Sequence, residues 1–392
     1  MNTKAENDTV SITISRDELY RRILILLYKN EELSLSELSQ EIGVAISDLT
    51  SSLNFLEQKG FIRQVGSTEK DDKRKVALRE SVNCIIGLDL GGTKLYGAIS
   101  DIAGNILYDQ EIKNHGKSGE ACFDMLVDLI ARLIDESGRR SLKLVGIGID
   151  VPGRVQLETG FVINAPAVNM KDFPLKERLV SRFGYPVYID NDLKQAALGE
   201  AWFGAGGKYN NVVLLAIGTG IAASAVIDGS PLRGAHLRQG ELGWMVPGRD
   251  FLGRKYVGFG ALETEASGPG IESRAKRLLS GTANMFLLEG LDAESVFEAA
   301  KEGQGWAQQC VAETVEYLAV LIANIMAFYD PDIIILSGGV SRSSEMLIPP
   351  IMNLIEGCVL TQPYLVSSSL GYKAGALGAI INLVKNCPEI FR

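Results

Sequence analysis

The sequence contains few histidines and no closely spaced cysteines. Among its 392 residues there are only two histidines, His115 and His236, which excludes a His-rich metal site. The five cysteines are scattered without a close pair, so we expect no disulfide framework and a reducing compartment. The N-terminus lacks the apolar segment of a signal peptide, and no apolar run approaches the ~20 residues of a membrane span. We therefore expect a cytoplasmic protein with no membrane partner.

An excess of positive charge is also missing. The formal net charge is −9, which argues against a protein that coats nucleic acid or a membrane surface. Any contact with DNA must therefore be local. Hydrophobic residues make up 46% and charged residues 22% of the chain, values that are ordinary for a soluble globular protein. The length is sufficient for two or three domains with substantial cores.

The first 80 residues have the pattern of a small helical module. Ser15 and Ser34 each precede an amphipathic stretch and have a glutamate three residues on, which predicts a capped helix start. Ser47 is expected to cap a third helix. The short strand candidates Phe61–Val65 and Lys75–Leu78 then flank a charged tip. Three helices followed by a β-hairpin predict a winged helix-turn-helix domain.

Two groups of polar side chains in this module are candidates for contacting DNA. They are Ser47, Thr50, Ser51 and Asn54 on the third helix, and Lys73, Arg74 and Lys75 on the wing. The module holds 12 Lys and Arg against 14 Asp and Glu, a net charge of −2. We therefore expect weak DNA binding by one copy, and a homodimer or higher homo-oligomer that reads two half-sites of an operator. A module for oligomerisation or protein docking is the alternative.

A glycine turn after a short apolar run is a candidate for binding phosphate. The run leads into Asp89, which is followed by Gly91, Gly92, Thr93 and Lys94. Glycines let backbone N–H groups approach an oxyanion closely, and the hydroxyl and ammonium groups add further donors. The carboxylate of Asp89 could hold Mg²⁺ through water. An ordinary Gly-Gly hairpin is the alternative.

Strands and helices alternate in the rest of the chain, which predicts an α/β fold. Pro186–Ile189 is a predicted strand that delivers Asp192 to its end, where a general base would face a cleft. The alternative role for Asp192 is the N-cap of the helix that follows.

Further glycines follow two later strands. Gly218, Thr219 and Gly220 form a second candidate phosphate turn. Gly338 and Gly339 follow the strand Ile333–Leu336, and with a small-residue turn at 375–378 they are expected to close around an adenosine.

With these motifs in order, the chain resembles the ROK family of repressors and sugar kinases over nearly its whole length. The resemblance implies the two-lobed, actin-like ATPase fold of hexokinases, an α/β fold, preceded by the winged helix-turn-helix domain. The implied domains are the winged helix-turn-helix domain at 1–80, an N-terminal lobe at 84–200 and a C-terminal lobe at 201–392. Asp192 would be the catalytic base, and the glycine turns would hold ATP. The sugar contacts that the resemblance implies are Gly153, Asn169, Asn191, Asp192, Glu241, Trp244 and Glu263.

The zinc site of the family is missing from the sequence. Trp244 stands where the family usually has a histidine, and Arg254, Tyr256 and Ala261 stand at the three cysteine positions. None of these side chains replaces a thiolate or an imidazole on Zn²⁺, so we expect no zinc. Trp244 would either stack on a sugar face or fill the space left by the metal.

Two functions remain open from the sequence. The first is a transcriptional regulator whose cleft senses a sugar, with ATP and Mg²⁺ as further ligands. The second is an ATP-dependent sugar kinase, in which Asp192 accepts the proton of the attacking sugar hydroxyl.

Overall fold

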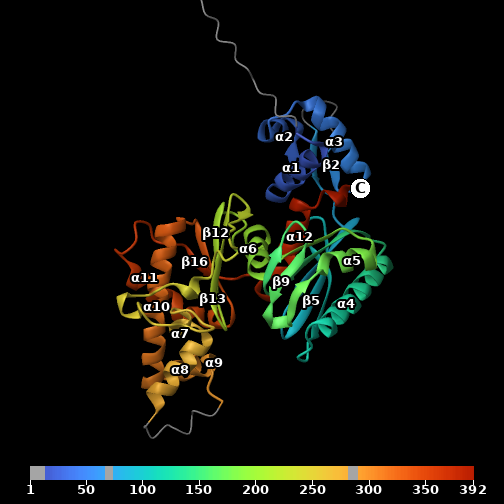
Figure 1. The fold of residues 1–392 in the computed structure, drawn as a ribbon. Coiled ribbons are helices and arrows are strands. Elements are labelled where there is room, and N and C mark those ends of the chain that lie inside the picture. The colour runs from blue at the N-terminus through green and yellow to red at the C-terminus, as the bar shows by residue number, and fades with distance from the viewer. Residues whose placement is uncertain (1–13, 67–73, 281–289) are drawn as a thin grey trace, which may run out of the picture.

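The computed structural model describes residues 14–66, 74–280 and 290–392. A small helical domain sits above one of two larger lobes, which lie side by side (Figure 1). The small domain has three helices and a short antiparallel sheet of order β1-β3-β2. Its elements are α1 (Arg16–Lys29), β1 (Leu33–Ser34), α2 (Leu35–Ile42), α3 (Ile46–Gln58), β2 (Ile62–Val65) and β3 (Lys75–Leu78).

The helix starts of this domain follow the predicted caps in part. Ser34 forms a full capping box with Glu37 at the start of α2, and Ser15 accepts a hydrogen bond from the Glu18 N–H at the start of α1. The expectation for Ser47 is wrong. Ala45 occupies the N-cap of α3, and Ser47 lies inside the first helical turn.

The N-terminal lobe is a five-stranded sheet of order β11-β7-β4-β5-β6, with a smaller sheet, β10-β9-β8, beside it. Because β4, β7 and β11 are parallel neighbours, their carboxyl ends meet at one edge. The elements are β4 (Asn83–Leu90), β5 (Lys94–Asp101), β6 (Ile106–Lys113), α4 (Glu120–Arg139), β7 (Lys143–Val151), β8 (Arg154–Gln156), β9 (Phe161–Ala165), η2 (Pro166–Val168), β10 (Met170–Phe173), α5 (Leu175–Phe183), β11 (Val187–Asn191) and α6 (Asp192–Phe203).

The C-terminal lobe is a second five-stranded sheet, of order β14-β13-β12-β15-β16, with most of its helices packed on one face (Figure 1). The strands and short helices are β12 (Asn211–Ile217), β13 (Ile221–Ile227), β14 (Ser230–Pro231), η3 (Leu242–Trp244), η4 (Arg249–Phe251), β15 (Ile333–Ser337), η6 (Gly339–Ser343) and β16 (Leu365–Ser367). The α-helices are α7 (Glu263–Ala266), α8 (Gly268–Leu279), α9 (Ala293–Lys301), α10 (Gly305–Tyr329) and α11 (Ser344–Ile355).

Helix α10 is long and apolar enough to cross a membrane by length and composition alone. Half of its most apolar 18-residue window is buried inside the protein. Leu318, Ile322 and Ile325 belong to the same hydrophobic core as strands β12 and β15. A core helix of a globular protein passes the same test, and this packing is that of a core helix.

The last helix, α12 (Ala374–Asn386), leaves the C-terminal lobe and packs on β4 and β7 of the N-terminal lobe and along α6. Small residues make this close crossing feasible. A Cβ atom at Gly378 would lie 1.6 Å from the carbonyl oxygen of Gln195, and one at Gly199 would lie 2.1 Å from that of Ala374. The expected turn at 375–378 is therefore wrong, since these residues are helical and buried. We propose that the C-terminal lobe ends before α12.

The winged-helix domain rests on the ends of these helices. Phe391 of the terminal helix η8 (Pro388–Phe391) lies 5.5 Å from the Tyr20 ring and 5.3 Å from the Phe61 ring, measured between centroids. The Arg21 guanidinium donates to the carbonyl oxygen of Lys385 at 2.6 Å. The winged-helix domain and the N-terminal lobe therefore share one hydrophobic cluster.

Candidate functional site

A cavity of about 580 Å³, here called the cleft cavity, lies between the two lobes. Its walls come from the loop after β7, the start of α6, the β12–β13 turn and residues 237–241. Five of the predicted sugar contacts line it: Gly153, Asn191, Asp192, Glu241 and Glu263. Asn169 and Trp244 are not among the residues that line this cavity.

Asp192 is the first residue of α6, and Asn191 before it is the N-cap. The Asn191 side chain accepts from the Lys194 N–H at 3.2 Å, so the capping role considered for Asp192 is filled by its neighbour. Asp192 Oδ1 accepts hydrogen bonds from the Leu193 N–H and the Asn191 amide, each at 2.8 Å. Burial raises the pKa of Asp192 to about 6. A carboxylate with this pKa can take up a proton near neutral pH.

Asp89 and Asp150 are cross-strand neighbours at the ends of β4 and β7, and their carboxyl groups share a hydrogen bond. Asp150 also accepts from the Leu90 N–H at 3.1 Å. Burial raises the pKa of both groups, and the mutual proximity of Asp89, Asp150 and Asp192 raises that of Asp150 further. Two carboxyls at one strand edge are suitable oxygen ligands for Mg²⁺, which completes its shell with water and phosphate. In the described ranges, no cluster of three or more His, Cys, Asp or Glu could hold an ion alone.

The first glycine turn is tight and lies outside the walls of the cleft cavity. The Gly91 N–H donates to the Lys94 carbonyl at 3.0 Å, and a Cβ atom at Gly92 would lie 3.0 Å from the carbonyl oxygen of Ala167. The Lys94 ammonium pairs with Glu111 at 2.6 Å and lies 4.3 Å from the centroid of the Tyr372 ring. The Thr93 carbonyl accepts a hydrogen bond from the Asn114 N–H at 2.8 Å.

The second glycine turn borders two cavities. Gly218 and Thr219 line the cleft cavity and also an adjoining cavity of about 510 Å³, whose wall includes Gly339 and the starts of α8 and α9. Gly220 and Gly338 line the cleft cavity. Gly338 has a φ of +84°, and a Cβ atom there would lie 2.4 Å from the carbonyl oxygen of Ile217, so this turn requires glycine. A phosphate chain that passed from one cavity to the other would therefore run along the backbone of these glycine turns.

Glu263 and Trp244 occupy the segment where the sequence lacks zinc ligands. The Glu263 carboxylate is buried and accepts from the Gly260 N–H at 2.8 Å and the Ile221 N–H at 3.0 Å. It therefore ties the loop before α7 to strand β13. The side chain of Trp244 is 51% exposed, so the expectation that it fills the space left by a metal is wrong.

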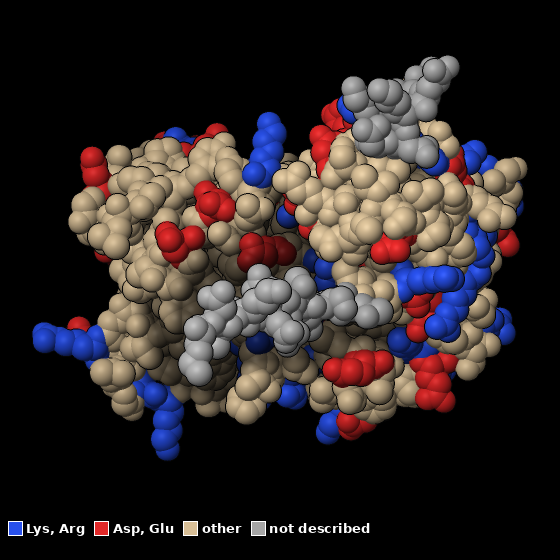
Figure 2. All heavy atoms as spheres, turned by 90° about the horizontal axis from the view of Figure 1, so that it is seen from above, with Lys and Arg blue, Asp and Glu red and all other residues tan. Residues whose placement is uncertain are grey.

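The candidate DNA interface is less basic than the sequence indicated. Ser47, Ser51 and Asn54 are exposed on α3. The hydroxyls of Thr50 and Ser51 donate to the carbonyls of Ile46 and Asp48 in the same helix. Arg74 pairs with Glu57 at 2.7 Å, Lys75 pairs with Glu32, and Lys73 lies outside the described residues. On the face seen from above, basic and acidic side chains are interspersed (Figure 2).

Several polar side chains of the site were missed by sequence reasoning. They are Asp150, Arg154, Asn164, Lys194, Arg238 and Gln239. Lys194 is the most informative, because its charge lies in a helix whose other residues from 195 to 200 are mostly small or buried. A lysine in a helix of this kind was the feature of the sequence that could have indicated a residue of the site.

Comparisons with known proteins agree with the fold. A model of the ROK family matches residues 85–386, and a winged helix-turn-helix DNA-binding model matches residues 16–63. The xylose repressor of Caldicellulosiruptor bescii is 26% identical over 377 residues, which cover 93% of this chain and 94% of the repressor. A glucokinase of Halalkalibacterium halodurans is 33% identical over 308 residues, which cover 75% of this chain and 92% of the kinase.

Comparison with solved structures identifies the same fold. A ROK family transcriptional regulator, described as a homologue of the E. coli MLC protein, has a TM-score of 0.82 at 24% identity and covers 96% of this chain and 97% of its own. A ROK glucokinase from Streptomyces griseus, in complex with glucose and AMPPNP, has a TM-score of 0.61 at 27% identity, covering 76% and 98%. These likenesses confirm the expected actin-like ATPase fold. This chain belongs to the ROK family and carries an N-terminal winged helix-turn-helix domain.

Proposed function

We propose that this protein is a transcriptional regulator that binds an operator through its winged helix and responds to a sugar in the cleft cavity. The likeness to the xylose repressor spans the winged-helix domain and both lobes together. The likeness to the glucokinase covers 75% of the chain, a share that leaves room for the N-terminal domain outside it. The xylose repressor therefore shares the whole architecture of this chain.

The observation that supports this proposal most is the path of α6. Its first residue, Asp192, lines the cleft cavity, and its last residues, Trp202 and Phe203, contact Tyr28 of the winged-helix domain. The ring centroids of Tyr28 and Phe203 are 5.8 Å apart. Helix α12 runs alongside α6 and provides the Lys385 carbonyl that Arg21 binds. A change in lobe closure would move both helices and with them the winged-helix domain.

A homodimer would turn this movement into control of DNA binding, because two winged-helix domains must match the spacing of two half-sites. The operator and the sugar would be the two partners, and a cytoplasmic location would give access to both. A sugar shifts DNA affinity only by its preference for one lobe arrangement, typically 5- to 150-fold.

The test begins with duplexes selected from a random library by the full-length protein. Their affinity is then measured by fluorescence anisotropy at fixed salt, with and without glucose, xylose and other monosaccharides. We expect at least one sugar to shift the DNA midpoint about 5-fold or more. Robust ATP-dependent turnover of a hexose, with no effect of that hexose on DNA binding, would contradict the proposal.

A sugar kinase is the second candidate, and the raised pKa of Asp192 favours it. ATP with Mg²⁺ would supply the phosphoryl group. Gly218, Thr219 and Gly339 border the cavities where the phosphates and nucleoside would lie, and Asp89 with Asp150 would hold the metal. Asp192 would accept the proton of the sugar hydroxyl. The coupled assay of ADP release with each sugar separates this function from the first.

A further inference from the structure

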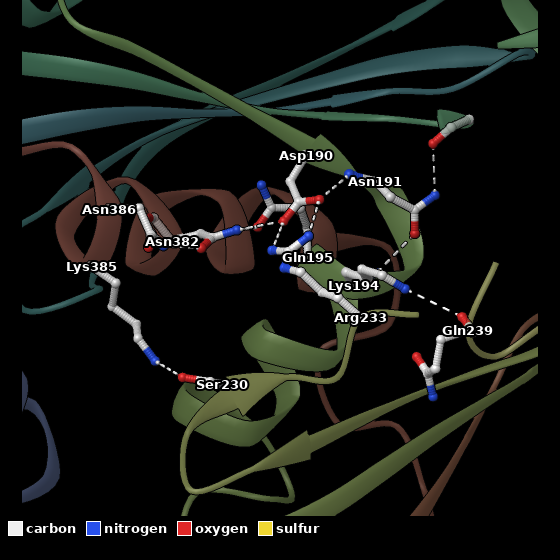
Figure 3. Close-up of polar contacts among 11 residues, drawn as sticks. Asp190, Asn191, Lys194, Gln195, Ser230, Arg233, Gln239, Asn382, Lys385 and Asn386 are labelled. Carbon is white, nitrogen blue, oxygen red and sulfur yellow. Dashed lines mark hydrogen bonds and ion pairs between the residues drawn. The ribbon is translucent and has the colours of Figure 1, made fainter. Parts of the chain in front are cut away.

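Lys194 is a buried cation that forms no ion pair with the residues that the structure describes. It is the third residue of α6, its side chain lines the cleft cavity, and the residue is only 5% exposed. In the described part of the chain, its ammonium has one hydrogen bond, to the Gln239 carbonyl at 3.3 Å (Figure 3). Burial lowers the pKa of Lys194. A buried ammonium with a single weak hydrogen-bond partner keeps part of its desolvation cost, although the nearby charges of Asp190, Glu241 and Asp192 offset some of it.

The nearest carboxylates are committed to other partners. The Asp190 carboxylate accepts hydrogen bonds from both terminal nitrogens of Arg233, at 2.6 and 3.1 Å (Figure 3). It accepts a third from the Asn382 amide at 3.0 Å. Asp192 accepts from the Leu193 N–H and the Asn191 amide. The negative charge of Glu241 also favours the charged form of Lys194, but Glu241 is exposed to solvent. Lys194 therefore points into the cavity without an ion pair of its own.

Two further cations line the same cavity from other segments. Arg154 lies on β8 in the N-terminal lobe, and Arg238 lies on the segment before Gly240 in the C-terminal lobe. Neither has an ion pair within the described ranges. Acceptors for sugar hydroxyls are present as well, in Asn164, Asp192 and Glu241. The cavity thus offers groups for both hydroxyls and an anion.

We propose that the ligand of the cleft cavity is an acidic monosaccharide derivative, whose anionic group is held by Lys194 together with Arg154 and Arg238. This inference rests on the proposal that the cavity binds a sugar. A neutral sugar would displace water and leave the Lys194 charge unpaired, whereas an anion would form charge-assisted hydrogen bonds with it. The anion is a phosphate ester or a carboxylate, and both have the oxygen acceptors that these cations bind.

The experiment is isothermal titration calorimetry on the full-length protein without DNA. Glucose and xylose are each compared with their terminal phosphate ester and their aldonic acid, and inorganic phosphate is titrated alone. We expect at least one acidic member to bind about 10-fold or more tightly than its neutral parent and than inorganic phosphate. The phosphate and carboxylate arms identify which anion is preferred.

Lys194→Met preserves the length of the side chain and removes its charge. It should weaken the acidic ligand about 10- to 100-fold and change the neutral parent by less than about 3-fold. Lys208→Met, on an exposed loop outside the cavity, is the matched control and should bind as the unmodified chain does. If Lys194→Met fails to fold, Arg238→Gln, on an exposed segment, tests the same preference with a smaller expected loss.

Three outcomes would overturn the inference: neutral sugars bind as tightly as their acids, no acidic member binds, or Lys194→Met leaves the affinity for the acidic ligand unchanged. Because DNA is absent from this experiment, a failure of the ligand to alter DNA binding contradicts the proposed function and leaves this inference intact.

Discussion

Tyr28 of the winged-helix domain meets Trp202 at the end of α6 edge to face, with ring centroids 6.1 Å apart and ring planes at 85°. The ammonium groups of Lys29 and Lys385 lie 5.6 and 5.3 Å from the same indole ring. Burial and the nearby Lys29 lower the pKa of Lys385 to about 8. Neither the Tyr28 hydroxyl nor the Trp202 Nε1 has a hydrogen-bond partner among the described residues. This junction therefore combines aromatic packing with unsatisfied polar groups.

The unsatisfied hydroxyl makes Tyr28→Phe a stabilising change. Removing a buried donor that has no partner should raise the free energy of unfolding by about 1 kcal/mol. Tyr96→Phe is the matched control, because the Tyr96 hydroxyl donates to Asp109 at 2.8 Å, and its loss should cost about 1 kcal/mol. Urea unfolding of both variants measures the difference. Equal losses in the two would show that Tyr28 has a partner that the packing does not reveal.

Asp192→Asn should change stability in a pH-dependent manner. Since burial raises the pKa of Asp192 to about 6, the folded protein holds a proton that the unfolded chain releases near pH 4. The contribution of Asp192 to the free energy of unfolding therefore falls as the pH rises from about 4 to about 6. Above pH 6 the full cost of burying the charged carboxylate is present. The amide removes this cost and should add on the order of 2 kcal/mol at pH 8 and little at pH 4. Denaturant curves at both values test it.

The same variant separates the two candidate functions. A working kinase should lose about 10²- to 10⁴-fold in rate, while sugar binding drops much less. A regulator should keep its DNA affinity without sugar and respond at a different sugar concentration. Unchanged phosphorylation by Asp192→Asn would exclude Asp192 as the base.

Asp190, which is buried, forms an ion pair between the two lobes with Arg233, whose side chain is 26% exposed. Arg233→Met should lower the free energy of unfolding by about 3–5 kcal/mol, because it leaves Asp190 buried and unpaired. Adding Asp190→Asn should recover part of that loss. The ion pair of Arg140 and Glu136, whose side chains are 42% and 19% exposed, gives a comparison, and Arg140→Met should cost less than about 1 kcal/mol. Similar costs at both sites would mean that Asp190 reaches solvent.

The wing should provide most of the DNA affinity through phosphate contacts. Replacing Lys73, Arg74 and Lys75 with alanine should weaken binding similarly on all sequences and reduce the slope of log affinity against log salt by about one per lost contact. Arg139 and Arg140, on α4 of the N-terminal lobe, are the control pair. An unchanged slope would mean that the wing does not touch DNA.

Purified protein should contain no zinc. Trp244 is largely exposed, and Arg254, Tyr256 and Ala261 offer no thiolate or imidazole. Elemental analysis after dialysis should therefore give well below one zinc per chain. About one zinc per chain would require ligands from elsewhere in the sequence.

Local sequence signals predicted the elements better than the contacts between them. Ser34 with Glu37 predicted the start of α2, because a capping box depends on residues within one helical turn. The role of Asp150 depends on the order of β11, β7 and β4 in the sheet, which no local pattern contains. The helix at 375–378 was misread as a turn because glycine usually ends helices, whereas here it permits the close crossing with α6. A lysine in the helix at 192–203 was visible in the sequence, but its burial and its place in the cavity wall depend on tertiary packing.

The return of α12 to the N-terminal lobe has a consequence for biosynthesis. The apolar surfaces of Tyr20 and Phe61, and the face of β4 and β7 that Ala376 and Ala379 cover, are completed only by α12 and η8, which come much later in the sequence. A nascent chain emerging from the ribosome must therefore carry these apolar surfaces uncovered until α12 and η8 have been translated. Interrupted translation products would expose both surfaces at once, and we expect them to depend on chaperones and to be degraded rather than accumulate as free DNA-binding fragments.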